Sequence, residues 1–332
     1  MVLRQYSSNQ PLLFLSFPAI ISAIVLPPAF AGNLQVQKTY FPIDYLFKLQ
    51  EISSLSIGIL ASILIFGGAV LTNLLYNRFE FQNQASYVPA LLYSLLASAF
   101  CLNSVSLPSL ASNIFLLAGL FRCLQVYRQS RALGEYFQAG FWFGMASLTF
   151  PPLVVMLLSL WLMVLFTRAF NWREFVLPLL GFGVPFLYWV VWQYWFDSSF
   201  DFILFRGYFT LADHSPWESY TWSETYFFIA TGTVLLLALP GFLFLGDRPS
   251  NKSRNLRVTF LLVVLGLIAA MGIERALIYE YTPSILIIPF SIMGGLWFSN
   301  YRYSLIAPFA FYFFLICLSL FTLHSNGVFG DF

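Results

Sequence analysis

Two carboxylates, Asp44 and Glu51, stand seven positions apart in the polar segment that separates the first two long apolar stretches. A carboxylate in such a place can act as a general base, or it can bind a divalent cation that steadies the phosphate of a lipid. The alternative is that both acids are solvated loop residues near Lys38 and Lys48. The interpretation as solvated loop residues is favoured, because a catalytic acid is recognised by an environment that perturbs its pKa, and the sequence does not show such an environment.

A second polar segment, residues 196–225, combines charged with aromatic side chains. Its basic groups are Arg206 and His214, among five acidic residues. Its aromatic residues include Phe202, Phe205 and Trp217. This mixture is typical of chain that lies in the headgroup region of a bilayer, and residues 198–207 are predicted to form a short helix along that surface. Anchoring is the favoured role; the alternative is a lid over a lipid-linked substrate.

Other catalytic or metal-binding chemistry has little support. The sequence contains no GxSxG, HExxH, Walker or dinucleotide-binding motif. Two histidines are too few to favour a Ser-His hydrolase or a His-rich metal site. Cys101, Cys123 and Cys317 lie in or beside apolar stretches without metal-ligand spacing, so they are predicted to be buried apolar residues and no metal site is predicted.

The composition identifies the class of protein that must position these residues. Of the 332 residues, 59% are hydrophobic and 9% are charged, whereas soluble domains carry about 25% charged residues. A soluble domain and a disordered chain are therefore excluded. The net charge of +2, without a basic tract, gives no support for nucleic-acid binding. The sequence predicts an all-α bundle, a single integral membrane domain over residues 1–332.

Eleven apolar segments are predicted to cross the bilayer. They cover approximately residues 12–30, 52–76, 88–103, 110–127, 136–149, 152–167, 175–195, 226–245, 258–274, 283–299 and 304–323. The segments 88–103 and 136–149 are short for a crossing, which needs about 20 residues, and each is interpreted as tilted or re-entrant. Pro18, Pro27 and Pro28 are expected to kink the first segment and to end it early.

The distribution of Lys and Arg predicts the orientation of these segments. With the N-terminus inside, twelve of the 16 basic residues fall on the cytoplasmic side, as the positive-inside rule requires. The remaining four are Lys38, Lys48, Arg206 and Arg275. The C-terminus and the two polar segments, residues 31–51 and 196–225, are then outside.

Two features within the spans concern helix packing and buried charge. Gly140 and Gly144 form a GxxxG pattern, which allows two helices to approach closely, and it is predicted to serve packing inside the bundle. Glu274 and Arg275 close the ninth segment and are predicted to be interfacial anchors. Charge is otherwise scarce within the spans, which argues against an ion-coupled transporter.

The middle of the chain resembles known membrane proteins. The residues that carry the resemblance are Asn113 to Arg122, Tyr127 to Arg131, the stretch from Phe137 to the turn Leu148-Thr149-Phe150-Pro151-Pro152, and Asn171-Trp172-Arg173. They resemble an uncharacterised family of Gram-negative bacterial inner-membrane proteins, a domain of unknown function. The same stretch is similar in outline to polytopic GT-C glycosyltransferases, in which such a turn is followed by an apolar span and a basic cytoplasmic turn, here Arg168 with Arg173.

The GT-C resemblance implies a GT-C-like fold and a transferase that uses a polyprenyl-phosphate-linked sugar at the outer leaflet. In that case Asp44, with Glu51 nearby, would be the catalytic base or metal ligand, and a divalent cation would be the cofactor. Arg206, His214 and Arg275 would face the phosphate. The sequence departs from the enzymes in the spacing of its two acids and in Phe150, which occupies a position that is usually basic.

The favoured hypothesis is therefore a non-catalytic subunit or scaffold of the cell envelope with a degenerate GT-C-like fold. Its partners would be membrane lipids or other envelope membrane proteins, contacted through Phe202, Phe205 and Trp217. The glycosyltransferase is the alternative, and a transporter is the weakest of the three. In all three cases the resemblance implies the bacterial inner membrane, and the distribution of Lys and Arg predicts a cytoplasmic N-terminus and a periplasmic C-terminus.

Overall fold

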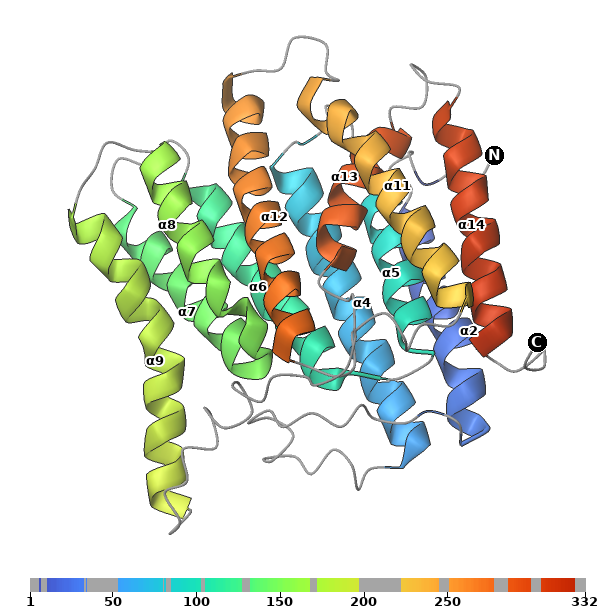
Figure 1. The fold of residues 1–332 in the computed structure, drawn as a ribbon, viewed down its shortest axis with the longest axis horizontal. Coiled ribbons are helices and arrows are strands. Elements are labelled where there is room, and N and C mark those ends of the chain that lie inside the picture. Colours follow the sequence, from blue (N-terminus) through green and yellow to red (C-terminus); the bar gives the residue numbers. More distant parts are fainter. Residues whose placement is uncertain are drawn as a thin grey trace.

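The computed structural model (Figure 1) describes residues 6, 11–32, 34, 53–79, 81, 85–102, 105–126, 132–167, 172–196, 222–244, 251–277, 286–299 and 306–325. Within these residues the regular elements are eleven α-helices and two short 3-10 helices, η1 (Pro11–Leu15) and η3 (Pro151–Val155). The α-helices are α2 (Ser16–Phe30), α4 (Ser54–Arg78), α5 (Val88–Phe100), α6 (Leu107–Gln125), α7 (Leu133–Thr149), α8 (Met156–Thr167), α9 (Trp172–Phe196), α11 (Trp222–Phe244), α12 (Asn251–Leu277), α13 (Ile287–Ser299) and α14 (Ile306–Ser325). The all-α prediction is confirmed, and each α-helix overlaps one of the eleven predicted apolar segments.

Four helical stretches are long and apolar enough to cross a membrane, which indicates a membrane protein. They are Leu13–Phe30, Ser54–Arg78, Leu107–Gln125 and Trp172–Trp195. Several other helices are apolar but shorter, and α5 and α13 have 13 residues each. At about 1.5 Å per residue such a helix reaches roughly 20 Å, which is less than the ~30 Å of a bilayer core.

The helices are packed side by side, and helices that follow one another in the chain run in opposite directions (Figure 1). Neighbouring pairs lead from α9 at one edge through α7, α6 and α4 to the central α5 and α13, and then through α11 to α14 at the other edge. A second layer is formed by α8 and α12, which contact each other, while α2 packs against α4 and α5. Consecutive helices are antiparallel because most of the connections between the apolar segments are short, whereas α7 and α9, which are separated in the chain by α8, run parallel.

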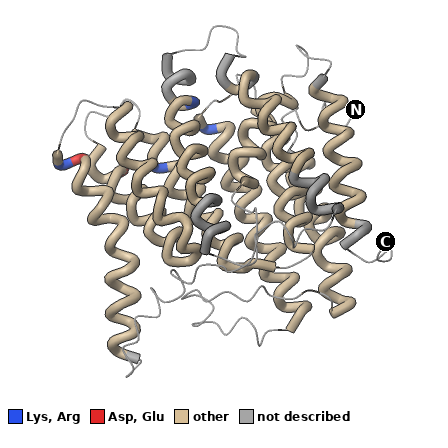
Figure 2. The backbone as a smooth tube through the Cα atoms, in the orientation of Figure 1, with Lys and Arg blue, Asp and Glu red and all other residues tan. Residues whose placement is uncertain are grey.

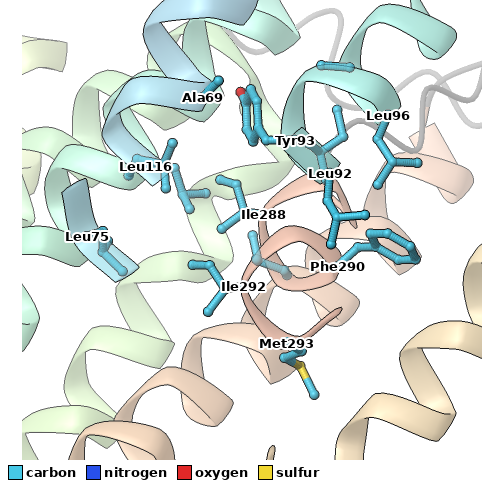
Figure 3. Packing of buried hydrophobic residues seen from close by; sticks show 14 of the residues in the cluster. Ala69, Leu75, Leu92, Tyr93, Leu96, Leu116, Ile288, Phe290, Ile292 and Met293 are labelled. Atoms are coloured by element: carbon cyan, nitrogen blue, oxygen red, sulfur yellow. The ribbon is translucent and has the colours of Figure 1, made fainter. Parts of the chain in front are cut away.

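The core lies around α13 and α5. All 13 residues of α13 are buried, and its apolar side chains meet those of α5 and α4 (Figure 3). Leu92, Ile288, Phe290, Ile292 and Met293 belong to this cluster. A helix that is apolar on every side has to be surrounded by other helices or by lipid, and here other helices surround it.

The proline-rich turn after α7 forms as the sequence predicts. Thr149 is the last residue of α7, and Phe150 has an extended backbone with φ −138° and ψ 94°. Pro151 and Pro152 start η3 instead of continuing α7, because proline lacks the N–H that the helix needs and disfavours helical geometry in the residue before it. Phe150 is buried in the core at 2% exposure, so an apolar contact occupies this position.

The expectation that prolines end the first segment early is wrong. The segment begins as η1, and α2 then continues to Phe30 with Pro27 and Pro28 inside it. Its last turn is supported by α4: the Ser54 hydroxyl donates to the Ala29 carbonyl at 3.2 Å, and Gly58 lies directly against Ala29. Pro18 causes no break, because the first N–H groups of a helix have no acceptor within it. Tertiary packing therefore outweighs the two missing hydrogen bonds.

The prediction that Gly140 and Gly144 pack within the bundle is confirmed. Both glycines of α7 face the main chain of α9, at the carbonyls of Pro178 and Phe182, and a Cβ atom on either would collide with that backbone. Gly181 of α9 makes the reciprocal approach to the backbone of α7. Small residues at three positions thus bring the two backbones into contact, which is the usual basis of tight helix pairs in membranes.

Candidate functional site

The candidate site residues from the sequence lie almost entirely outside the described residues. This applies to Asp44, Glu51, Phe202, Phe205, Arg206, His214 and Trp217 and to the predicted surface helix 198–207. Arg275 belongs to the last helical turn of α12, without a described side chain. The helix ends that flank both polar segments, those of α2, α4, α9 and α11, lie at the lower end of the bundle, as does the end of α12 (Figure 1). Both segments therefore leave and re-enter the bundle at one end.

A buried arginine lies at the opposite end of the bundle. Arg257 lies in the second turn of α12 and is 7% exposed. Its Nη1 donates to the Phe242 carbonyl at 3.0 Å, and its Nη2 donates to the Phe81 carbonyl at 3.3 Å. The guanidinium also lies over the Phe242 ring, 5.9 Å from its centroid. One side chain thereby joins α12, the end of α11 and the chain just after α4.

Aromatic rings cluster beside this arginine. The rings of Phe81, Phe242 and Phe260 contact one another, with centroid distances of 6.0 Å, 5.9 Å and 5.4 Å. Tyr76 stacks on Phe81 at 6.0 Å, and its hydroxyl lies 3.4 Å from that of Ser299. Aromatic faces attract a cation and exclude water, so hydrogen bonds within this shell are stronger than they would be at the surface.

The arrangement acts as a structural clamp. The Phe242 carbonyl belongs to the last turn of α11, where carbonyl groups lack partners within the helix, and the arginine supplies one. The sequence interpretation treated Arg257 only as one of the charges that set orientation. Its spacing contained a further signal, because Arg257, Phe260 and Val264 recur at helical spacing and all are buried.

The other described arginines also lie near the ends of helices. Arg122 pairs with Glu135 at 3.4 Å, and Arg78 lies over the Phe121 ring at 5.4 Å. Together with Arg173 in the first turn of α9 and Arg257, they gather toward one end of the bundle (Figure 2). Two of the three cysteines are buried, as predicted, whereas Cys317 is only partly buried.

The edge helix α9 presents a broad apolar surface. It packs mainly on α7 and α8, and its lower part projects beyond its neighbours (Figure 1). The exposed side chains there are Leu187, Tyr188, Val191, Trp192, Tyr194 and Trp195, between 48% and 78% exposed. This α9 face leads directly into the polar segment 196–225, so the aromatic character of that segment extends into the fold.

Most of the chain matches a known protein family. Residues 30–328 match a family that is described as a family of unknown function, DUF6427. No curated protein and no solved structure matches the chain. The fold and the geometry described above therefore carry the functional argument.

Proposed function

The chain belongs to the DUF6427 family of unknown function, and we propose that it is a non-catalytic subunit or scaffold of the bacterial cell envelope. In this proposal the bundle stays in the inner membrane and holds a partner membrane protein beside α9 and the polar segment 196–225. The GT-C-like outline belongs to the same proposal and refers to architecture alone.

The observation that carries this proposal is the α9 face. Tyr194 and Trp195, at the end of α9, are 74% and 78% exposed. The helix packs mainly on α7 and α8, so its other side is left uncovered. Tryptophan and tyrosine combine a large apolar surface with a polar group, so they suit the interface between membrane and water and also dominate protein interfaces. The buried Arg257 donates its hydrogen bonds to main-chain carbonyls, so its charge stabilises the fold.

Photo-crosslinking in living cells tests the proposal. Benzoylphenylalanine at position 195 is expected to give one discrete protein adduct, because this side chain points away from the bundle. The matched control is position 320, since Leu320 is 52% exposed near the end of the opposite edge helix, α14. We expect no protein adduct at 320. Protein adducts at neither position would contradict a partner at the α9 face.

Complementation of a deletion strain distinguishes the scaffold from an enzyme. For a scaffold, Asp44→Asn and Glu51→Gln restore the wild-type phenotype, whereas alanine at Phe202, Phe205 or Trp217 does not. For a glycosyltransferase the outcome is reversed, because a lost base or metal ligand abolishes turnover. Immunoblots of the membrane fraction verify that each variant is present at the wild-type level.

We also propose that the end of the bundle with the described arginines faces the cytoplasm. Anionic lipids and the positive-inside rule favour this orientation. In intact cells of a Cys317→Ala strain, a membrane-impermeant maleimide is expected to label Ser215→Cys. It is expected to label Ser250→Cys only after the inner membrane is permeabilised. Labelling of Ser250→Cys in intact cells would reverse the proposed topology.

A further inference from the structure

Most buried serine hydroxyls in the helices form a hydrogen bond within their own helix. Ser94, Ser112, Ser147, Ser291 and Ser299 each donate to a carbonyl three residues earlier, at 2.7 to 3.1 Å. This local hydrogen bond is the usual solution where no water is available. It makes any buried hydroxyl that does not use it conspicuous.

Thr72 and Tyr93 are such exceptions at the contact between α4 and α5. Both residues are 0% exposed. Neither the Thr72 Oγ1 atom nor the Tyr93 hydroxyl has a hydrogen-bond partner among the described residues. Buried polar groups in folded proteins are almost always hydrogen-bonded, to protein or to ordered water, so two orphaned hydroxyls at one helix contact call for a ligand.

The two hydroxyls lie beside neighbouring turns of α4. Tyr93 directs its ring toward α4 beside Ala69 (Figure 3), and its hydroxyl touches Gly68, where a side chain would block it. Thr72 follows Gly68 by one helical turn, which separates Cβ positions by about 5 to 6 Å. A water molecule that makes one hydrogen bond of ~2.8 Å to each hydroxyl would bridge about the same distance. The Asn113 side chain of α6, 1% exposed, lies near the Tyr93 hydroxyl.

We propose that α4, α5 and α6 enclose a binding site for a single water molecule, bridged between the Thr72 and Tyr93 hydroxyls with Asn113 beside it. A buried water typically makes two to four hydrogen bonds to polar groups that otherwise lack partners, and this junction supplies two such hydroxyls, those of Thr72 and Tyr93. The site is independent of the proposed scaffold function, since none of its residues belongs to the α9 face.

The sign of a stability change tests the site. Tyr93→Phe removes the hydroxyl and keeps the ring, and Thr72→Val replaces its hydroxyl with a methyl group. If a water bridges them, each substitution lowers the folding equilibrium constant, by about threefold as for other polar contacts between membrane helices. In the double variant the second substitution then costs much less, because the bridge is already lost. Reversible unfolding in mixed detergent micelles provides the measurement.

The other outcomes overturn the proposal. A dry contact predicts that each substitution stabilises the protein, because it removes a buried polar group without a partner. Direct bonding of Tyr93 to Asn113 predicts a loss for Tyr93→Phe that simply adds to the effect of Thr72→Val. Ser94→Ala is the control, since its hydroxyl is bonded within α5, and it is expected to show no coupling to Thr72→Val. Water-edited solid-state NMR supplies a second readout, in which polarisation from water reaches the Tyr93 ring in the wild type and not in Thr72→Val.

Discussion

The substitution Gly144→Leu is expected to lower the free energy of unfolding by about 3 kcal/mol or more, at the upper end of the cost of overpacking. A Cβ atom there would lie 2.5 Å from the Phe182 carbonyl oxygen and 3.1 Å from its Cα atom. These are main-chain atoms of α9, so no rotamer change relieves the collision and the two helices must separate. Unfolding of the purified protein in mixed micelles measures the loss.

Gly183 provides the matched control on α9. A Cβ atom at Gly183 meets no atom within 4 Å, and the residue is exposed. Gly183→Leu is therefore expected to leave stability within about 0.5 kcal/mol of the wild type. Equal losses for Gly144→Leu and Gly183→Leu would show that the α7–α9 contact is not as close as described. Because α9 packs mainly on α7 and α8, the damage is also expected to abolish the adduct at position 195.

Methionine at position 257 is expected to destabilise the protein by about 3 kcal/mol. Hydrogen bonds to charged groups contribute about 1.5 to 3 kcal/mol each, and Arg257→Met removes two while leaving the Phe242 and Phe81 carbonyls inside an apolar shell. Arg257→Lys is expected to recover only part of the lost stability. Lysine keeps the positive charge, but its ammonium group lacks the planar fork with which arginine reaches both carbonyls. The same unfolding experiment measures all three proteins.

Arg122 is the control for the loss of a positive charge at the same end of the bundle. Its side chain is 38% exposed and pairs with Glu135 at 3.4 Å, and such ion pairs contribute at most about 1 kcal/mol. If Arg122→Met costs as much as Arg257→Met, the effect arises from net charge, and the clamp made by Arg257 is not its cause. The opposite ranking supports a specific hydrogen-bonded clamp.

Hydropathy predicted where helices occur better than where they end. Each predicted segment corresponds to one α-helix, but α12 begins at Asn251, seven residues before the predicted start of its segment at 258. Residues such as Lys252 and Arg254 lower the apolar score without preventing helix formation, because they are good helix formers. In α2 the prolines suggested an early end, and contacts with Ser54 and Gly58 prolonged the helix.

The candidate site illustrates the same division. The sequence drew attention to Asp44, Glu51 and the segment 196–225, whose residues lie outside the described part of the chain, apart from the helix end at Phe196. It treated Arg257 as a marker of orientation, since its partners are main-chain carbonyls, and these carry no signature in the side-chain sequence. The GxxxG pattern predicted a close helix contact, but nothing in it pointed to α9 as the partner.

The sequence by itself determined the class of protein, the all-α architecture and the positions of eleven apolar helices, because these depend on composition and on the length of apolar runs. Only the tertiary structure decided that α13 is buried on every side while α9 lies at an edge, although both are strongly apolar. Apolar runs that lipid and protein bury equally well do not reveal which of the two surrounds them. That choice depends on shape, on glycines that admit a neighbouring backbone and on the few polar groups, such as Arg257, that require a partner.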